Sequence, residues 1–111
     1  MYNAQREVVY LGRDNTVDLQ LLANGVPIDL DAVTKFELKD VLCGWDTIDS
    51  TTSPTAFDKT KGNGTLVLNL GDEGISPGDQ SAWLILYDVL HDDGVVWGKI
   101  FFSVINICAS P

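Results

Sequence analysis

The sequence predicts an all-β protein, a single antiparallel β-sandwich of the immunoglobulin-like or jelly-roll-like kind with about seven to nine strands. Short runs of alternating apolar and polar residues recur at roughly even spacing, separated by Gly, Asp, Asn and Pro. No segment keeps apolar residues at the i, i+3, i+4, i+7 positions of a helix for long enough to form one. The 111 residues suit one domain, residues 1–111, with short flexible N- and C-terminal tails.

The first part of the chain predicts three short strands, the last two of which flank a tight turn. Residues 6–11 are a short β-branched and aromatic run, and residues 16–23 alternate cleanly. Asn24-Gly25 is the dipeptide of a two-residue hairpin, because both residues tolerate positive φ. Residues 26–30 form a brief strand at an edge or a bulge, since the proline within them cannot donate to a sheet ladder.

The middle of the chain is less regular. Residues 33–40 alternate again, and residues 44–55 are rich in Ser, Thr and Asp, which indicates a long loop with at most one short strand. A short strand is expected at residues 56–58, and a clear one at residues 65–70.

The last hairpin is expected to join residues 81–90 to residues 95–107 across "HDDG", where Asp93-Gly94 is a strong turn signal. On the first strand, three side chains are expected to point into the core or to pack with the second sheet: Trp83, Ile85 and Tyr87.

The second strand of this hairpin is apolar on both faces. One set of alternate residues suits a sandwich core: Val96, Gly98, Ile100, Phe102 and Val104. The other set is also largely apolar: Val95, Trp97, Lys99, Phe101, Ser103 and Ile105. Because a surplus apolar face usually marks a partner site, we expect Phe101 and Ile105, with Val95 on the same face, to lie in a protein interface. Trp97 could be shared with the core, and the loop at residues 44–55 is an alternative cover.

Trp45 lies in that polar loop, which leaves two interpretations. An exposed loop tryptophan can be a sugar platform or an anchor for a protein contact, so Trp45 joins the expected interface residues. Alternatively, Trp45 folds back as a lid over one end of the sandwich.

The charge is lopsided, with 16 Asp and Glu against 7 Lys and Arg, a net charge of -9. No Lys or Arg occurs between Gly62 and Gly98. Such a surface repels phosphate, so we expect neither nucleic acid nor a membrane as a partner. It suits a basic protein surface, or it simply keeps the protein soluble.

The sequence predicts no catalytic, cofactor-binding or metal-binding residues, and therefore no enzyme. The single histidine, His91, lies beside the predicted turn and has the setting of a turn residue. The acidic pairs lack the spacing of a calcium loop. We expect Cys43 and Cys108 to be reduced, with a disulfide between them as the less favoured alternative. No signal peptide is expected from "MYNAQREVVYLG", and the protein is expected to fold in a cytoplasm.

Two stretches resemble known families. Asp79-x-Ser81-x-Trp83-x-Ile85 resembles the immunoglobulin strand-F pattern, with Trp83 at the tyrosine position and Ile85 where a disulfide cysteine would stand. The stretch "NTVDLQLLANGVPIDLDAVTKFELKD" is similar to the start of small β-sandwich domains in tailed-phage structural proteins, which carry an "x-G-x-P-I-D-L" turn between two alternating strands.

The whole chain is similar to capsid decoration, or staple, proteins of short-tailed enterobacterial phages of the epsilon-fifteen type. That resemblance implies an all-β homodimer on the outer surface of the virion, folded in the host cytoplasm, that clamps neighbouring subunits of the major capsid protein. The chain also resembles a baseplate or tail-fibre adaptor module. From the residues alone, a carbohydrate-binding β-sandwich that uses Trp45 or Trp97 stays open as an alternative.

Overall fold

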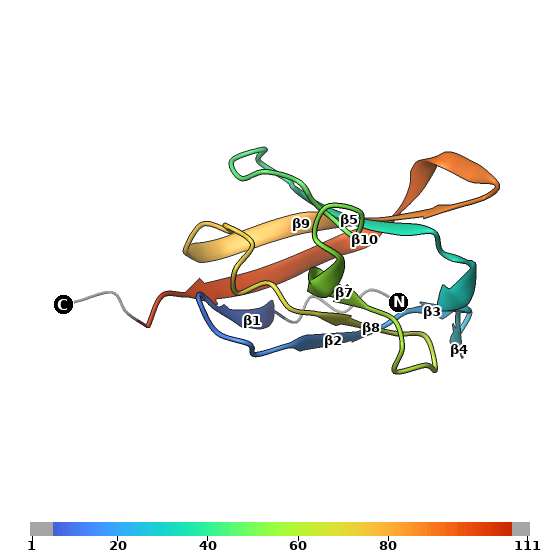
Figure 1. The fold of residues 1–111 in the computed structure, drawn as a ribbon, viewed down its shortest axis with the longest axis horizontal. Helices are drawn as coiled ribbons and strands as arrows, with labels where there is room; N and C mark the ends of the chain where they lie inside the picture. The colour runs from blue at the N-terminus through green and yellow to red at the C-terminus, as the bar shows by residue number, and fades with distance from the viewer. Residues whose placement is uncertain (1–5, 108–111) are drawn as a thin grey trace.

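The all-β prediction is confirmed by a computed structural model, which describes residues 6–107 (Figure 1). The strands are β1 (Arg6–Tyr10), β2 (Val17–Gln20), β3 (Leu22–Ala23), β4 (Val26–Pro27), β5 (Lys35–Asp40), β6 (Ile48–Asp49), β7 (Phe57–Asp58), β8 (Thr65–Leu68), β9 (Gly78–Asp88) and β10 (His91–Ile105). Two single-turn 3₁₀ helices, η1 (Leu30–Ala32) and η2 (Pro54–Ala56), complete the described elements. The expected terminal tails fall mainly outside these residues.

The strands form two main layers and a small hairpin. A five-stranded sheet has the order β1-β10-β9-β5-β6, a three-stranded sheet has the order β2-β8-β7, and β3 pairs with β4. In Figure 1, β5, β9 and β10 lie above β2 and β8. One pairing differs from the expected antiparallel sandwich, because β1 runs parallel to β10. The fold is therefore sandwich-like, with one parallel edge strand.

The core lies between these layers and is filled mainly by alternate residues of the strands of the two main sheets. The largest fully buried side chains are Phe102, Leu38, Leu66, Leu68, Leu70, Leu84 and Val9. The rings of Phe36 on β5 and Phe57 on β7 stack with centroids 5.9 Å apart and so join the two sheets. The predicted alternation of residues 33–40 is confirmed, since Phe36 and Leu38 are buried.

The tight turn at Asn24-Gly25 is confirmed. Asn24 has φ 54° and Gly25 has φ 79°, the positive pair that a type I′ hairpin requires. The turn joins β3 to β4, where Leu22 pairs with Pro27 and Ala23 pairs with Val26.

The last hairpin turns earlier than "HDDG". Asp88 pairs with His91, so the turn consists of Val89 and Leu90, and the predicted turn residues belong to the start of β10. The Asp88 carboxylate accepts a hydrogen bond from the Leu90 N–H at 2.9 Å, which stabilises a turn at this point. Gly94 keeps its positive φ of 82° within an irregular stretch of the strand, so it marks a bulge instead of the turn.

The expected core residues of β9 lie on the opposite face. Ala82, Leu84 and Leu86 are buried, which turns Trp83, Ile85 and Tyr87 outward, where each is partly exposed. The core prediction for these three residues is therefore wrong. The immunoglobulin strand-F alignment fails for the same reason, because Ile85 does not take the inward position of a disulfide cysteine.

A second irregularity, between Val96 and Gly98, exchanges the two faces of β10. Beyond it, Phe102 and Val104 are buried as predicted. Before it, Val95 pairs with the buried Leu86 and Val96 pairs with Ile85, so Val95 faces the core side and Val96 faces outward. The placement of Val96 in the core is wrong, since 57% of its surface is exposed. A bulge adds one residue to a strand, and a simple period of two cannot anticipate it.

Candidate protein-interaction surfaces

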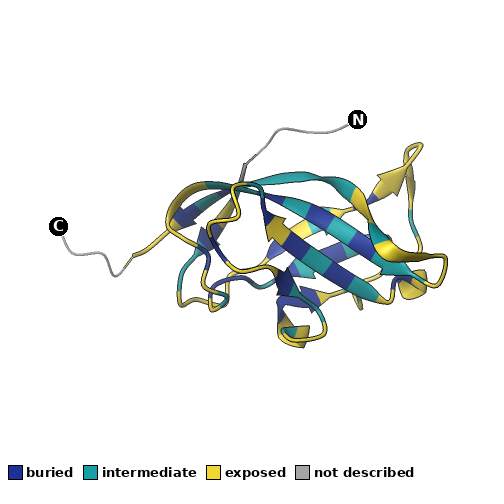
Figure 2. Ribbon diagram, turned by 90° about the horizontal axis from the view of Figure 1, so that it is seen from above, coloured by how far each residue is buried: buried dark blue, intermediate teal, exposed yellow. Residues whose placement is uncertain are grey.

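The largest candidate surface is the side of the five-stranded sheet that faces away from β2, β8 and β7, here called the outer face. The register of β5, β9, β10 and β1 places these residues on it: Lys35, Glu37, Lys39, Asp79, Ser81, Trp83, Ile85, Tyr87, Val96, Lys99, Phe101, Ser103, Ile105, Val8 and Tyr10. Figure 2 shows how buried and partly buried residues alternate along these strands. No strand within residues 6–107 forms a layer over this face (Figure 1).

The part of the outer face on β1 and β10 is aliphatic and accessible. Val8 and Ile105 each expose 40% of their surface on neighbouring strands, and Phe101 is partly buried beside Ser81. Phe101 and Ile105 therefore do share one face, as the sequence predicts. Their role in an interface stays a prediction.

The two other β10 residues of the predicted interface lie elsewhere. Val95 turns to the core side at the bulge, and Trp97 packs against the core cluster, so neither shares a face with Phe101 and Ile105. The expectation that Trp97 could be shared with the core agrees with this packing.

The part of the outer face on β5 and β9 combines lysines with aromatic rings. Lys35 Nζ lies 4.2 Å from the centroid of the Tyr87 ring, and Lys99 Nζ lies 4.9 Å from that of Trp83. Both distances fit cation–π contacts. The Tyr87 hydroxyl donates to Glu37 Oε1 at 3.0 Å, and burial, with this bond, raises the pKa of Tyr87. These contacts hold Tyr87 in one orientation.

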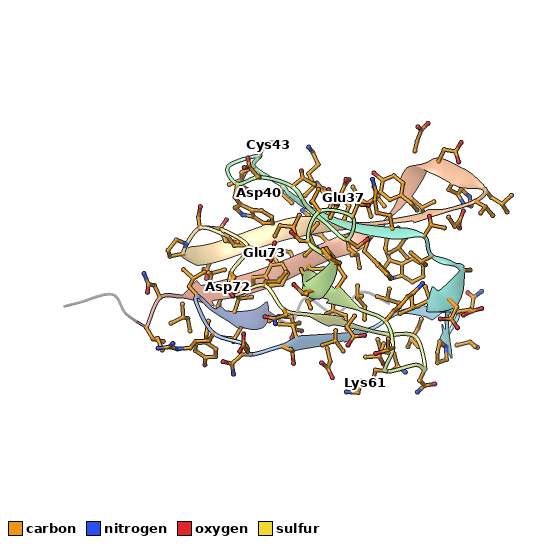
Figure 3. The ribbon with its side chains drawn as sticks, in the orientation of Figure 1. Glu37, Asp40, Cys43, Lys61, Asp72 and Glu73 are labelled. Atoms are coloured by element: carbon orange, nitrogen blue, oxygen red, sulfur yellow. The ribbon has the colours of Figure 1, made fainter. Side chains whose placement is uncertain are left out.

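Trp45 is not an exposed platform, and the interpretation as a lid describes its position. Only 7% of its surface is exposed, and its indole N–H donates to Gln80 Oε1 at 3.3 Å. Asp40, itself 3% exposed, places the loop: its carboxylate accepts hydrogen bonds from the backbone N–H groups of Leu42, Gly44 and Trp45. Figure 3 shows Asp40 and Cys43 where this loop leaves β5. Trp45 is therefore a core residue, and the expectation that it forms an exposed contact platform is wrong.

A second candidate surface, missed by the sequence analysis, is the end of the β9–β10 hairpin, here called the hairpin tip (residues 88–96). Val89 and Leu90 expose 82% and 84% of their surfaces, and Val96 exposes 57%. The tip extends past the last β5–β9 pair, Lys35–Tyr87, and appears as the orange loop at the upper right of Figure 1. Its sequence signal is Asp88, which is placed two residues before Leu90 to form an Asx turn.

The polar residues of the tip form a local pair. His91 Nδ1 lies 2.7 Å from Asp88 Oδ1, and this contact lowers the pKa of Asp88. His91 is thus beside a turn, as predicted, and it contacts an aspartate on the same hairpin.

Residues 6–107 offer few other candidates for a metal, ligand or thiol site. Within residues 6–107, no group of three or more His, Cys, Asp or Glu side chains could hold a metal ion. A shallow cavity of about 390 Å³ adjoins Asp29, Asp31 and Lys59, but Lys59 Nζ already donates to the carbonyls of Leu30 and Val33. Cys43 is exposed, and its expected relation to Cys108 lies outside the described residues.

Comparisons with protein-family models, with curated proteins and with solved structures returned no match for this chain. Among the described residues, no helix has the length and apolar character that crossing a membrane requires.

Proposed function

We propose that this protein is a non-catalytic virion protein that binds the outside of an assembled phage capsid and clamps neighbouring subunits of the major capsid protein. The observation that carries the proposal is the outer face, where Val8, Phe101 and Ile105 form an accessible apolar patch on adjacent strands. An apolar patch on a paired sheet is typical of a protein contact. The resemblance to capsid decoration proteins supplies the kind of partner.

The stabilising effect follows from binding to the assembled state alone. A footprint that spans two or more capsid subunits exists only after assembly, so each bound copy favours the shell over its free subunits. A homodimer, which the same resemblance implies, would supply two such footprints and would gain affinity from their linkage. No covalent chemistry is needed for this role.

The test uses shells assembled from the major capsid protein that is encoded in the same genome. Ile105→Asp and Phe101→Asp should each weaken co-sedimentation with these shells about tenfold or more, because a charge replaces an apolar contact. Leu22→Asp is the matched control, since Leu22 exposes 44% of its surface on β3 and lies outside the outer face. Unchanged binding of both outer-face variants, at unchanged thermal stability, would remove the proposed surface.

The positions of the three tryptophans argue against a carbohydrate-binding module. Trp45 is buried, Trp97 packs against the core, and Lys99 stands over the Trp83 ring, where a sugar would have to stack. The baseplate or tail-fibre adaptor differs from the main proposal only in the assembly that the outer face would bind.

A further inference from the structure

We infer that the hairpin tip is a second, separate contact, a preformed plug that inserts into an apolar pocket rimmed by Lys or Arg on the partner protein. The inference rests on the proposed function, in that the partner is taken to be the assembled shell. It adds a surface at the end of the hairpin that shares only Val96 with the outer face, and it names the chemistry that this surface would meet.

The apolar side chains of the tip are exposed, and nothing within residues 6–107 covers them. Val89 and Leu90 expose more than four fifths of their surfaces, at 82% and 84%. Val95 and Val96, further along the same hairpin, expose 40% and 57% of their surfaces. The side chains of Val95 and Val96 point to opposite sides of the hairpin, because Val95 pairs with Leu86 on the core side and Val96 pairs with Ile85 on the outer face. A pocket that encloses the tip would cover both sides, whereas a flat surface would cover only one.

Contacts at the turn and at the base of the tip restrict its shape. The Asp88 carboxylate accepts the Leu90 N–H and contacts His91, which fixes the turn. At the base, Gly94 packs so closely that an added Cβ would lie 2.6 Å from Ile85 Cγ2 and 2.9 Å from the Tyr87 ring. Tyr87 is in turn held by Glu37. A preorganised apolar tip loses little conformational entropy when it binds.

The tip carries acidic residues and no Lys or Arg. Asp88, Asp92 and Asp93 lie next to the apolar residues of the tip in the sequence, and no Lys or Arg occurs between Gly62 and Gly98. An acidic rim around an apolar plug complements a pocket with a basic rim and is repelled by an anionic lipid surface. The observations therefore favour a protein pocket over a membrane.

The test measures shell co-sedimentation of tip variants, each purified as the full chain. Leu90→Ser should lower the affinity for shells by about tenfold, because one exposed leucine loses its burial on binding. Leu42→Ser is a closely matched control, since Leu42 exposes the same 84% of its surface on the loop after β5, and it should bind like the wild type. Asp92→Asn with Asp93→Asn should weaken binding and flatten its salt dependence, because charge pairs with the rim are lost.

Each other outcome overturns the inference. Wild-type binding by both Leu90→Ser and the asparagine variant, together with weak binding by Ile105→Asp, would leave the proposed function intact and remove the plug. Failure of the wild type to bind shells would remove both. Leu90-dependent flotation with vesicles of phosphatidylcholine and phosphatidylglycerol would assign the tip to a membrane. Conversion of a dimer to a monomer by Leu90→Ser in sedimentation velocity would assign it to a second copy of the chain.

Discussion

Removing the Asp40 carboxylate should destabilise the protein, because this side chain at the end of β5 holds the loop that follows. Asp40 is 3% exposed, and it accepts hydrogen bonds from three backbone N–H groups at 3.2, 2.7 and 3.1 Å, those of Leu42, Gly44 and Trp45. Asp40→Ala deletes all three bonds. Because the loop holds Trp45 over the core, the change also loosens a buried tryptophan.

The expected change in the free energy of unfolding depends on what replaces each lost hydrogen bond. Leu42 and Gly44 are exposed residues, so water can take over part of their hydrogen bonding, at a net loss of about 1 kcal/mol or less for each. The Trp45 N–H is buried, and leaving it without an acceptor costs about 1–3 kcal/mol. The free energy of unfolding should therefore fall by about 1–5 kcal/mol. Asp40→Asn, which keeps one acceptor oxygen, should lose about half as much.

The assay is urea unfolding followed by far-ultraviolet circular dichroism, with native tryptophan emission recorded separately. Asp40→Ala should lower the unfolding midpoint and shift the native emission to longer wavelength as Trp45 becomes hydrated. Asp46→Ala is the control, because Asp46 is an exposed aspartate in the same loop and surface changes of this kind stay within about 0.5 kcal/mol. A loss below about 0.5 kcal/mol for Asp40→Ala would refute the role assigned to the carboxylate.

Three further predictions concern stability. Gly94→Ala should lower the free energy of unfolding by about 1–3 kcal/mol, because φ is 82° and an added Cβ would lie 2.6 Å from the nearest side-chain atom; an unchanged melting temperature would contradict this. Leu84→Ala, at a fully buried position, should cost about 2–5 kcal/mol in urea unfolding, and a smaller loss would mean that the core collapses around the cavity. Hydrogen bonds lower the folded-state pKa of Asp49, Asp58 and Asp88 below the ordinary value of 3.8. The stability that these carboxylates contribute is therefore present above about pH 4 and is lost as the pH falls through their folded-state pKa values. A urea midpoint that stays constant from about pH 6 to about pH 2.5 would exclude this contribution.

The fold class and the hairpin at Asn24-Gly25 could be predicted from the sequence, because both depend on local patterns. Alternation over residues 33–40 identified the buried side chains correctly, since β5 has no bulge. On β10 the same reasoning failed for Val95 and Val96, because the bulge at Trp97 shifts the register. The period of two holds only within an unbroken ladder.

Which face of β9 is buried depends on contacts that are distant in sequence, and the position of Trp45 depends on side-chain hydrogen bonds that an alternating pattern does not describe. Trp83, Ile85 and Tyr87 are as apolar as their neighbours, so composition alone could not decide which set faces the second sheet. Trp45 is buried because Asp40 turns the loop back, and a single aspartate in an acidic chain gives no signal of that role. The exposed tip was missed because the turn was assigned to Asp93-Gly94.

The most direct test of the proposed function compares assembled shells with free subunits of the same major capsid protein. Purified wild-type chain should co-sediment saturably with undecorated shells, should raise their resistance to heat, and should not bind the free subunits, because its footprint exists only after assembly. Protein that stays in the supernatant at every shell concentration, or that binds free subunits equally well, would contradict the account.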